Sequence, residues 1–274
     1  NRENALNSMI SPDIYKGVEP ITRSNGKVTF SGEDKILDYC VKMKELPQSD
    51  RMDNQLEKNT VTKSHIQDIA RILFDFHNQS HKAKEEYGRI EAIRDNFQPA
   101  FALKDFIQDE IGEGERMARI HKRVEHFFSR HKDLFKKRNR EERGRRGHGD
   151  VRSKNIFITE EKIYLFDAIE FSEKIASCDV AADLAYLAMD LNFFRYKELA
   201  DSLVDEYVSL SGDQDLLKLI DFYKCYRAVV QVLVQAYQLQ DEDVEKEQKE
   251  EAGELCREYL RLAEEFILKV KSEE

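Results

Sequence analysis

The sequence has 274 residues, of which 36% are charged and 41% are hydrophobic, and its net charge is −10. This length allows one large domain or two smaller ones, and the hydrophobic share excludes a disordered chain. The pI of about 5.4 argues against nucleic acid as a main partner, because binding a phosphate backbone requires a basic surface. An acidic surface would also suit a cationic substrate, although most such surfaces serve solubility.

Neither disulfides nor a membrane location is expected from this sequence. The four cysteines form no C-x-x-C pair and no zinc-binding spacing (Cys40, Cys178, Cys225 and Cys256). Free thiols fit a reducing cytoplasm. There is no apolar run of about 20 residues and no signal peptide, so we expect a cytoplasmic protein with no membrane partner. The sequence starts at Asn1 rather than at a methionine, which suggests a processed or truncated product.

The first 46 residues predict a small β-rich unit that follows the end of a helix. Apolar residues at helical spacing within 1–10 indicate the helix, and Pro12 terminates it. Ser24-Asn25-Gly26 is a hairpin turn signal. Strand-like runs are expected at residues 15–22, 28–30 and 37–43. The pattern breaks at Leu46-Pro47, so we place a boundary between a unit at 1–46 and a unit at 47–274.

From residue 47 onward the composition predicts a helical domain. Thr62 or Ser64 is a plausible N-cap, and an amphipathic stripe runs from Met117 to Phe135. We expect Pro99 to interrupt a helix and Gly112-Glu113-Gly114 to form a helix–helix turn. Further helices are expected at 83–94, 179–191, 197–210, 215–239 and 250–272, with a charged link at 241–251. The sum is an α+β chain in two lobes, with a hairpin inserted in the helical one.

Candidate catalytic residues gather in residues 147–155 and in the predicted hairpin that follows. Asp150 and Asn155 lie five residues apart on one loop, and Asp167 ends the second strand of the hairpin. These oxygens can converge on one point. A carboxylate suits a hydroxyl proton, and carboxylate and amide oxygens are ligands that Mg²⁺ prefers. The spacing matches H-x-D-x-x-x-x-N followed by a metal-binding Asp in phosphoryl-transfer enzymes.

This template gives each residue a role. Asp150 would accept the proton of the attacking hydroxyl, Asn155 and Asp167 would hold Mg²⁺, and Arg152 would steady the γ-phosphate. The alternative is a polar hairpin with a capping Asp. Loop, strand, turn and strand in this register favour the catalytic interpretation.

The run His148-Gly149-Asp150 to Asn155, with Leu165-Phe166-Asp167, resembles the aminoglycoside phosphotransferase and choline kinase group of the protein-kinase-like superfamily. It is most similar to the bacterial and archaeal "aminoglycoside phosphotransferase family enzyme" proteins of unassigned substrate. Weaker likeness extends over residues 11–18, 39–43, 76–77 and 179–187. The resemblance implies a two-lobed protein-kinase-like fold, with a truncated β-rich N-lobe and a larger, mainly helical C-lobe. It also implies ATP and Mg²⁺ as cofactors and a small-molecule hydroxyl acceptor, such as a sugar, an amino sugar or an aminoglycoside.

The resemblance also implies roles for residues outside the loop core. His148 would anchor the loop and Asp183 would brace it. Glu3 corresponds to the helix Glu on the nucleotide side, and the backbone at Met43 and Glu45 would meet adenine at the hinge between the lobes. The family's first strands, its phosphate-covering loop and its strand Lys have no counterpart after Asn1. The alternative is therefore a non-catalytic, kinase-like nucleotide-binding or regulatory module.

Acceptor-binding residues are less well defined by the sequence. Glu170 and Glu173 could bind a cationic substrate or support the metal, or they could be exposed strand ends. Tyr223 and Arg227 lie on a C-terminal helix that in the resembling enzymes forms the floor of the acceptor pocket, but core packing is favoured. We interpret the basic cluster at 136–146 as a helix end and a solvated turn. His121, His126 and His131 are interpreted as surface residues, because a spacing of five suits no metal site on one helix face.

Overall fold

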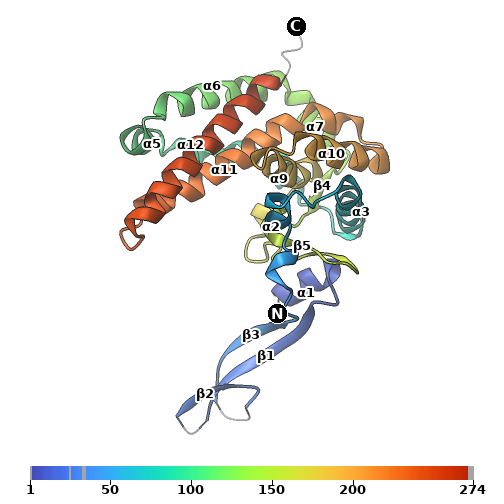
Figure 1. Cartoon of the computed structure of the whole chain (residues 1–274). Coiled ribbons are helices and arrows are strands. Elements are labelled where there is room, and N and C mark those ends of the chain that lie inside the picture. The colour runs from blue at the N-terminus through green and yellow to red at the C-terminus, as the bar shows by residue number, and fades with distance from the viewer. Residues whose placement is uncertain (1, 25, 33–34, 271–274) are drawn as a thin grey trace.

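The N-terminal region forms one helix and a three-stranded antiparallel sheet that projects from the rest of the protein as an arm (Figure 1). The computed structural model describes residues 2–24, 26–32 and 35–270. The elements of this region are α1 (Arg2–Ile10), β1 (Tyr15–Ser24), β2 (Lys27–Phe30) and β3 (Ile36–Met43). The strand order is β2-β1-β3, with Ile21 opposite both Phe30 and Asp38. The predicted helix and strands are confirmed, while Asn25 of the predicted turn lies outside the described residues.

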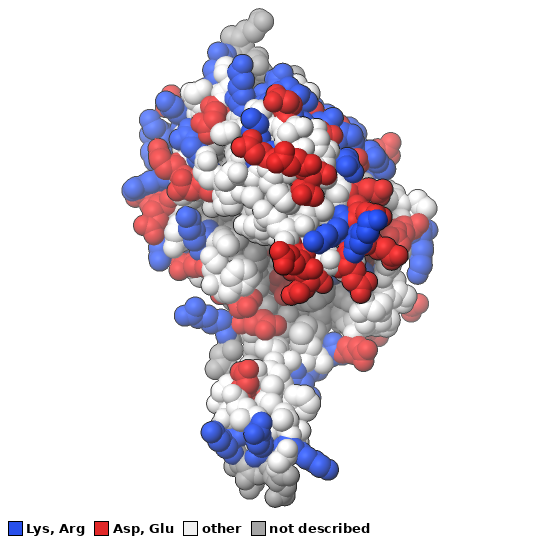
Figure 2. All heavy atoms as spheres, turned by 90° about the vertical axis from the view of Figure 1, so that its left-hand side faces the viewer, with Lys and Arg blue, Asp and Glu red and all other residues white. Residues whose placement is uncertain are grey.

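Most of the arm's apolar side chains are exposed, because neither face of its outer part packs against another element. Phe30 is 66% exposed and Tyr39 is 58% exposed. Figure 2 shows the arm as a narrow extension with Lys and Arg gathered toward its far end. The root of the arm contributes to a small core, in which Ile14, Tyr15 and Leu46 pack with Phe157 and Tyr164. This small core joins the arm to the body.

The body is mainly helical and contains two further short sheets. Its α-helices are α2 (Met52–Glu57), α3 (Lys63–Gln79), α4 (Ile90–Phe101), α5 (Lys104–Ile111), α6 (Gly114–Arg130), α7 (Lys132–Arg140), α8 (Glu173–Ala176), α9 (Val180–Phe193), α10 (Lys197–Ser211), α11 (Ile220–Gln240) and α12 (Lys246–Lys269). The 3₁₀ turns are η1 (Gln48–Asp50), η2 (Glu85–Gly88), η3 (Ser153–Asn155) and η4 (Gln214–Lys218). The strands pair as β4 (Gly144–Arg146) with β7 (Ser177–Asp179), and as β5 (Ile156–Ile158) with β6 (Ile163–Leu165).

The core of the body forms around α9 and an aromatic cluster. α9 is apolar on nearly all sides, so it is covered by α10 and α11 rather than lying at the surface. α11 and α12 pack along each other and extend with α5 and α6 to one side of the body (Figure 1). Phe222 of α11 stacks on Phe127 of α6, with ring centroids 4.4 Å apart, and contacts Phe97 of α4. Helices distant in sequence are thereby fixed against one another.

Several local predictions are confirmed. The side chain of Thr62 accepts a hydrogen bond from the backbone of His65 and caps α3. Gly112 has a φ of 73°, a left-handed conformation that ends α5 and begins the expected helix–helix turn. Residues 241–245 link α11 to α12, although α12 starts at Lys246, inside the predicted charged link. No helix among the described residues is long and apolar enough to span a bilayer.

Other local predictions are wrong. Residues 83–89 are not helical, because α3 ends at Gln79 and only a 3₁₀ turn precedes α4. Pro99 does not interrupt α4 but lies near its end, where packing of Phe97 and Phe101 outweighs the lost backbone hydrogen bond. The stripe from Met117 to Phe135 is divided between α6 and α7.

The basic cluster at 136–146 is not simply a solvated turn. Arg138 is 2% exposed and forms ion pairs with Asp179 at 2.5 Å and with Asp213 at 2.9 Å. Arg146 is also buried, in strand β4, which the sequence did not predict. Arginine tolerates these sites because its planar group can satisfy several acceptors at once.

Candidate active site

The candidate loop, residues 147–155, crosses the body between β4 and β5, and its two glycines are required by close contacts. A Cβ on Gly147 would lie 2.8 Å from a carboxylate oxygen of Asp183. Gly149 has a φ of 85°, and a Cβ there would lie 3.0 Å from the side chain of Ile169. Larger residues would therefore push the loop away from α9 and from the segment after β6.

Asp183, near the start of α9, holds the loop from below. Its carboxylate accepts hydrogen bonds from the backbone N–H groups of His148 and Gly149, both at 2.8 Å, and it lies 3.1 Å from Nε2 of His77 on α3. The side chain is fully buried. Burial alone would raise the pKa of Asp183, but the hydrogen bond from His77 and nearby positive groups hold that pKa below its usual range.

His148 connects the loop to the end of β6. Its Nε2 lies 3.0 Å from the carbonyl oxygen of Phe166, which can only accept, so the proton belongs on Nε2. Nδ1 then accepts from the backbone N–H of Asp150 at 3.3 Å. Burial lowers the pKa of His148 and favours this neutral form. The imidazole thus fixes the backbone of Asp150 relative to the residue that precedes Asp167.

The carboxylate of Asp150 is held by two side chains of its own loop. Arg152 donates two hydrogen bonds to it, at 2.7 and 2.9 Å, and Nδ2 of Asn155 donates a third at 2.9 Å. Burial would raise the pKa of Asp150, but the hydrogen bonds and charge of Arg152 hold it below the usual value. Arg152 also donates to Gln231 at 3.2 Å and lies over the ring of Tyr186. In this structure Arg152 is directed at Asp150.

Asn155 brings the loop and the strand end together. Its Nδ2 donates to Asp150, and its backbone oxygen accepts from the N–H of Phe166 at 3.1 Å. Because the amide nitrogen donates to a carboxylate, Oδ1 is the oxygen left to accept or to bind a cation. Asp167 follows Phe166 in a left-handed conformation, with a φ of 64°, and is exposed. The chain direction therefore changes at the residue predicted to bind the metal.

The side-chain oxygens of Asn155 and Asp167 are of the type that Mg²⁺ prefers as ligands. Asn155 and Asp167 would offer one amide and one carboxylate oxygen, and Mg²⁺ is usually held by one or two protein groups together with phosphate oxygens. In the part of the chain that the structure describes, no group of three or more His, Cys, Asp or Glu residues could hold a metal by itself. The three histidines of α6 and its C-terminal end form no such group either.

The helix α1 docks onto the same strand end. The hydroxyl of Ser11 bonds both backbone groups of Leu165, at 2.7 and 3.1 Å, and Asn7 accepts from the N–H of Ala168 at 2.8 Å. Glu3 is thereby near Asp167 and Glu170, and its pKa is raised by burial and by these two carboxylates. The sequence analysis missed Asn7 and Ser11. In the sequence they could be recognised by their spacing of four residues alone, which places two polar side chains on one side of the expected helix and its end.

A second buried carboxylate, Asp190, supports the loop and was also missed. It accepts hydrogen bonds from the backbone N–H and the hydroxyl of Ser153, at 2.7 and 2.6 Å. Burial raises the pKa of Asp190, whereas these bonds lower it. A signal was available, because Asp190 lies seven residues after Asp183 in an otherwise apolar helix and so falls on the same face.

The residues predicted to bind the acceptor are dispersed. Tyr223 and Arg227 are each 2% exposed. Arg227 donates to the carbonyl oxygens of Ala182 and Gly149, at 2.9 and 3.2 Å, so it supports the loop from behind. Tyr223 packs against Phe222 in the aromatic core.

The remaining predicted residues lie near the surface. Glu170 is half-buried, and Glu173 is exposed at the start of α8, with Lys84 3.5 Å away. Met43 and Glu45 are exposed where the arm joins the body. The adjacent backbone is anchored there by a hydrogen bond from the N–H of Lys44 to the oxygen of Ile14 at 2.8 Å.

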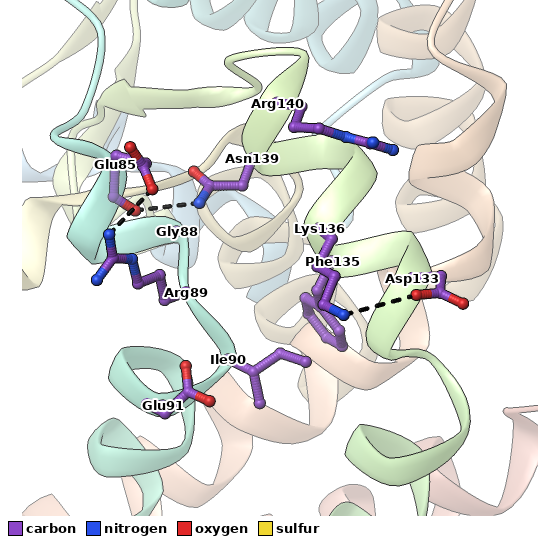
Figure 3. A pocket seen from close by; sticks show the side chains of 10 residues that line it. All are labelled: Glu85, Gly88, Arg89, Ile90, Glu91, Asp133, Phe135, Lys136, Asn139 and Arg140. Carbon is purple, nitrogen blue, oxygen red and sulfur yellow. Dashed lines mark hydrogen bonds and ion pairs between the residues drawn. The ribbon is translucent and has the colours of Figure 1, made fainter.

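A cavity of about 450 Å³ opens away from this loop, between η2, the start of α4 and α7 (Figure 3). Several of its polar groups are paired with one another. Arg89 pairs with Glu85 at 3.0 Å, and Asn139 donates to the carbonyl oxygen of Glu85 at 3.1 Å. We assign no function to this cavity.

Comparisons with known proteins identify relatives but no activity. One protein of Mycobacterium bovis and two of Mycobacterium tuberculosis, each named an uncharacterized protein, are 28% identical to the chain over 236 residues. The alignment covers 85% of the chain but 46% of each relative, so the chain spans about half the length of these curated relatives. No protein-family model and no solved structure gives a significant match.

Proposed function

We propose that the protein is an ATP-dependent phosphotransferase that acts on a hydroxyl group of a small molecule, such as a sugar, an amino sugar or an aminoglycoside. The proposal includes a cytoplasmic location and a kinase-like, two-lobed arrangement. In that arrangement α1 and the three-stranded sheet form the upper lobe, and the helical body forms the lower one. The strand end at Asp167 lies where α1 meets the body, as a nucleotide site between two such lobes would require.

One observation carries this proposal. Asn155 donates to the carboxylate of Asp150 with its side chain and, with its backbone, bonds the residue before Asp167. A proton acceptor and two oxygen ligands for a metal are thereby tied together by a single residue. A polar hairpin with a capping Asp needs no such three-way connection, and it needs no buried carboxylate below the loop.

The residues of the chain would divide the reaction as follows. Asp150 would orient the acceptor hydroxyl and take its proton as the oxygen attacks the γ-phosphorus of ATP, and the bond from that phosphorus to the β,γ-bridging oxygen would break so that ADP leaves. The lowered pKa of Asp150 keeps it ionised at neutral pH, so its oxygens can accept a hydrogen bond from the acceptor hydroxyl. Arg152 is held between Asp150 and Gln231, so its guanidinium can turn toward transferred phosphate while Gln231 keeps it in place. Mg²⁺ bound at Asn155 and Asp167 would neutralise part of the negative charge of the phosphates.

The test is Mg²⁺-dependent ATP turnover by the intact protein across a panel of sugars, amino sugars and aminoglycosides. Asp150→Asn keeps the size of the side chain but removes the proton acceptor, so we expect turnover to fall by about 10²- to 10⁴-fold. Asp38→Asn on the exposed strand β3 is the matched control and should keep full turnover. Full turnover by Asp150→Asn would refute the assignment.

A second candidate is a non-catalytic, kinase-like module that binds nucleotide or regulates a partner. The observation in its favour is the closed ion pair of Arg152 with Asp150, which occupies the carboxylate that catalysis would use. Calorimetry of ATP with Mg²⁺ separates the candidates further. Nucleotide binding without turnover on any acceptor would favour this second reading, whereas turnover that depends on Asp150 would exclude it.

A further inference from the structure

A second cavity, of about 460 Å³, lies beside α1. It is lined by Arg2, Leu6 and Met9 of α1, by Arg146 of β4, and by Glu170 and Glu173 after β6. None of the proposed phosphoryl-transfer chemistry uses the two arginines or the two apolar residues. The cavity therefore needs an explanation of its own.

Two faces of the helix α1 make different contacts. Glu3, Asn7 and Ser11 follow one another at intervals of four and lie toward the strand end, where Asn7 and Ser11 are bonded. Arg2, Leu6 and Met9 are spaced by four and three residues and line the cavity. Met9 is 51% exposed although it is a large apolar side chain. The second face thus offers apolar surface together with a terminal cation.

Arg146 is a buried cation that lacks a counter-ion. It is 7% exposed, and its guanidinium donates to the carbonyl oxygens of Gly147, at 2.8 Å, and of Ile169. Among the described residues, no carboxylate lies within ion-pair distance of it. Buried charges are normally paired, because desolvation is costly. Arg138, the other buried arginine of the same basic cluster, has two carboxylate partners.

The charges around the cavity leave an excess of cations. Glu173 has Lys84 at 3.5 Å. Setting that pair aside leaves Arg2 and Arg146 against Glu170 alone. Arg2 is exposed and forms no ion pair with any residue that the structure describes. A guanidinium group binds carboxylate and phosphate well because its planar fork matches two acceptor oxygens.

We propose that this cavity binds a small molecule with one anionic group, a carboxylate or a phosphate, and an apolar body. The anionic group meets Arg146 and Arg2, and the apolar body covers Leu6 and Met9. Glu170 limits the charge that the site accepts and disfavours polyanions. The lining includes none of Asp150, Arg152, Asn155 and Asp167, so the proposal does not depend on phosphoryl transfer.

Calorimetry with benzoate, phenyl phosphate and benzylammonium tests the site, because the three compounds have similar bodies but different charged groups. We expect benzoate or phenyl phosphate to bind, and their relative affinity distinguishes a carboxylate from a phosphate ligand. Arg2→Gln should weaken binding of the preferred anion by about fivefold to tenfold, as loss of one hydrogen bond at an exposed position predicts. Glu170→Gln should strengthen it.

Arg23→Gln removes the same charge from β1, outside the cavity, and should leave the affinity unchanged. Arg2 and Arg23 are both exposed, so both variants should fold normally, which thermal unfolding checks. Absence of saturable binding by both anions would overturn the proposal, as would equal affinities of Arg2→Gln and wild type. Preference for benzylammonium, lost in Glu170→Gln, would assign the cavity to cations instead.

Discussion

Residues 147–155 and the three-stranded arm differ in how their geometry is maintained. The loop is held by side chains from α9 and α11, which reach it from positions 34 or more residues away in sequence. The outer arm is held mainly by its own strand ladders, and its large apolar side chains are exposed. The loop geometry is therefore a property of the folded body, whereas the arm can change partners without disturbing the body's core.

The largest loss of stability is expected when the support below the loop is removed. Asp183→Ala removes a buried carboxylate that serves two backbone N–H groups and His77. We expect the free energy of unfolding to fall by about 3–5 kcal/mol, the cost typical of breaking a buried charged pair. Asp38→Ala in the arm should change it by less than about 0.5 kcal/mol. Urea unfolding of both variants measures the contrast, and similar losses would contradict the comparison.

The pH dependence of stability gives a second test of how the loop is supported. The pKa of Asp183 is lowered in the folded state from an ordinary value of 3.8, so its ionised form adds stability above that pH. As pH falls below about 4, the unfolded chain binds the proton first and this contribution is lost. The difference in unfolding free energy between wild type and Asp183→Asn should therefore narrow from pH 6 to pH 3. A constant difference across that range would show that the charge of Asp183 is not the stabilising feature.

Sequence patterns predicted the local structure better than the supporting contacts. The strands of the arm and the hairpin after the loop follow from alternating apolar runs and turn residues, which act within a few residues. The spacing of Asp150, Asn155 and Asp167 placed three groups on one connected segment, and the structure brings their backbones together. Such short-range relations can be read from one sequence.

Long-range relations could not be read in this way. That Arg152 would donate to Gln231, and that Arg227 would reach the carbonyl oxygen of Gly149, depends on how α11 packs against the loop. Pro99 inside α4 has the same cause, because aromatic packing between helices outweighs a local propensity. Tertiary contacts decide these cases, and no local pattern encodes them.

A moderate effect is expected where the loop meets Asp190. Ser153→Ala removes the hydroxyl that donates to this buried carboxylate at 2.6 Å. A hydrogen bond to a charged group contributes about 1.5–3 kcal/mol, so we expect a loss of unfolding free energy within that range. The control is Thr29→Val, which removes an exposed hydroxyl from the arm and should have no clear effect. Equal losses in the two variants would mean that Asp190 does not hold the loop.

The smallest effect on stability is expected at the outer edge of the arm. Among the described residues, β3 pairs with β1 alone, so its other edge lies open next to the exposed side chain of Tyr39. Such edges favour pairing with further strands, and a lysine on the edge opposes it. Tyr39→Lys should leave the unfolding transition of the body unchanged and reduce self-association at high protein concentration, which light scattering measures. If Tyr39→Lys instead lowered the unfolding free energy as much as Ser153→Ala, the arm would be an integral part of the core, and the contrast with the loop would fail.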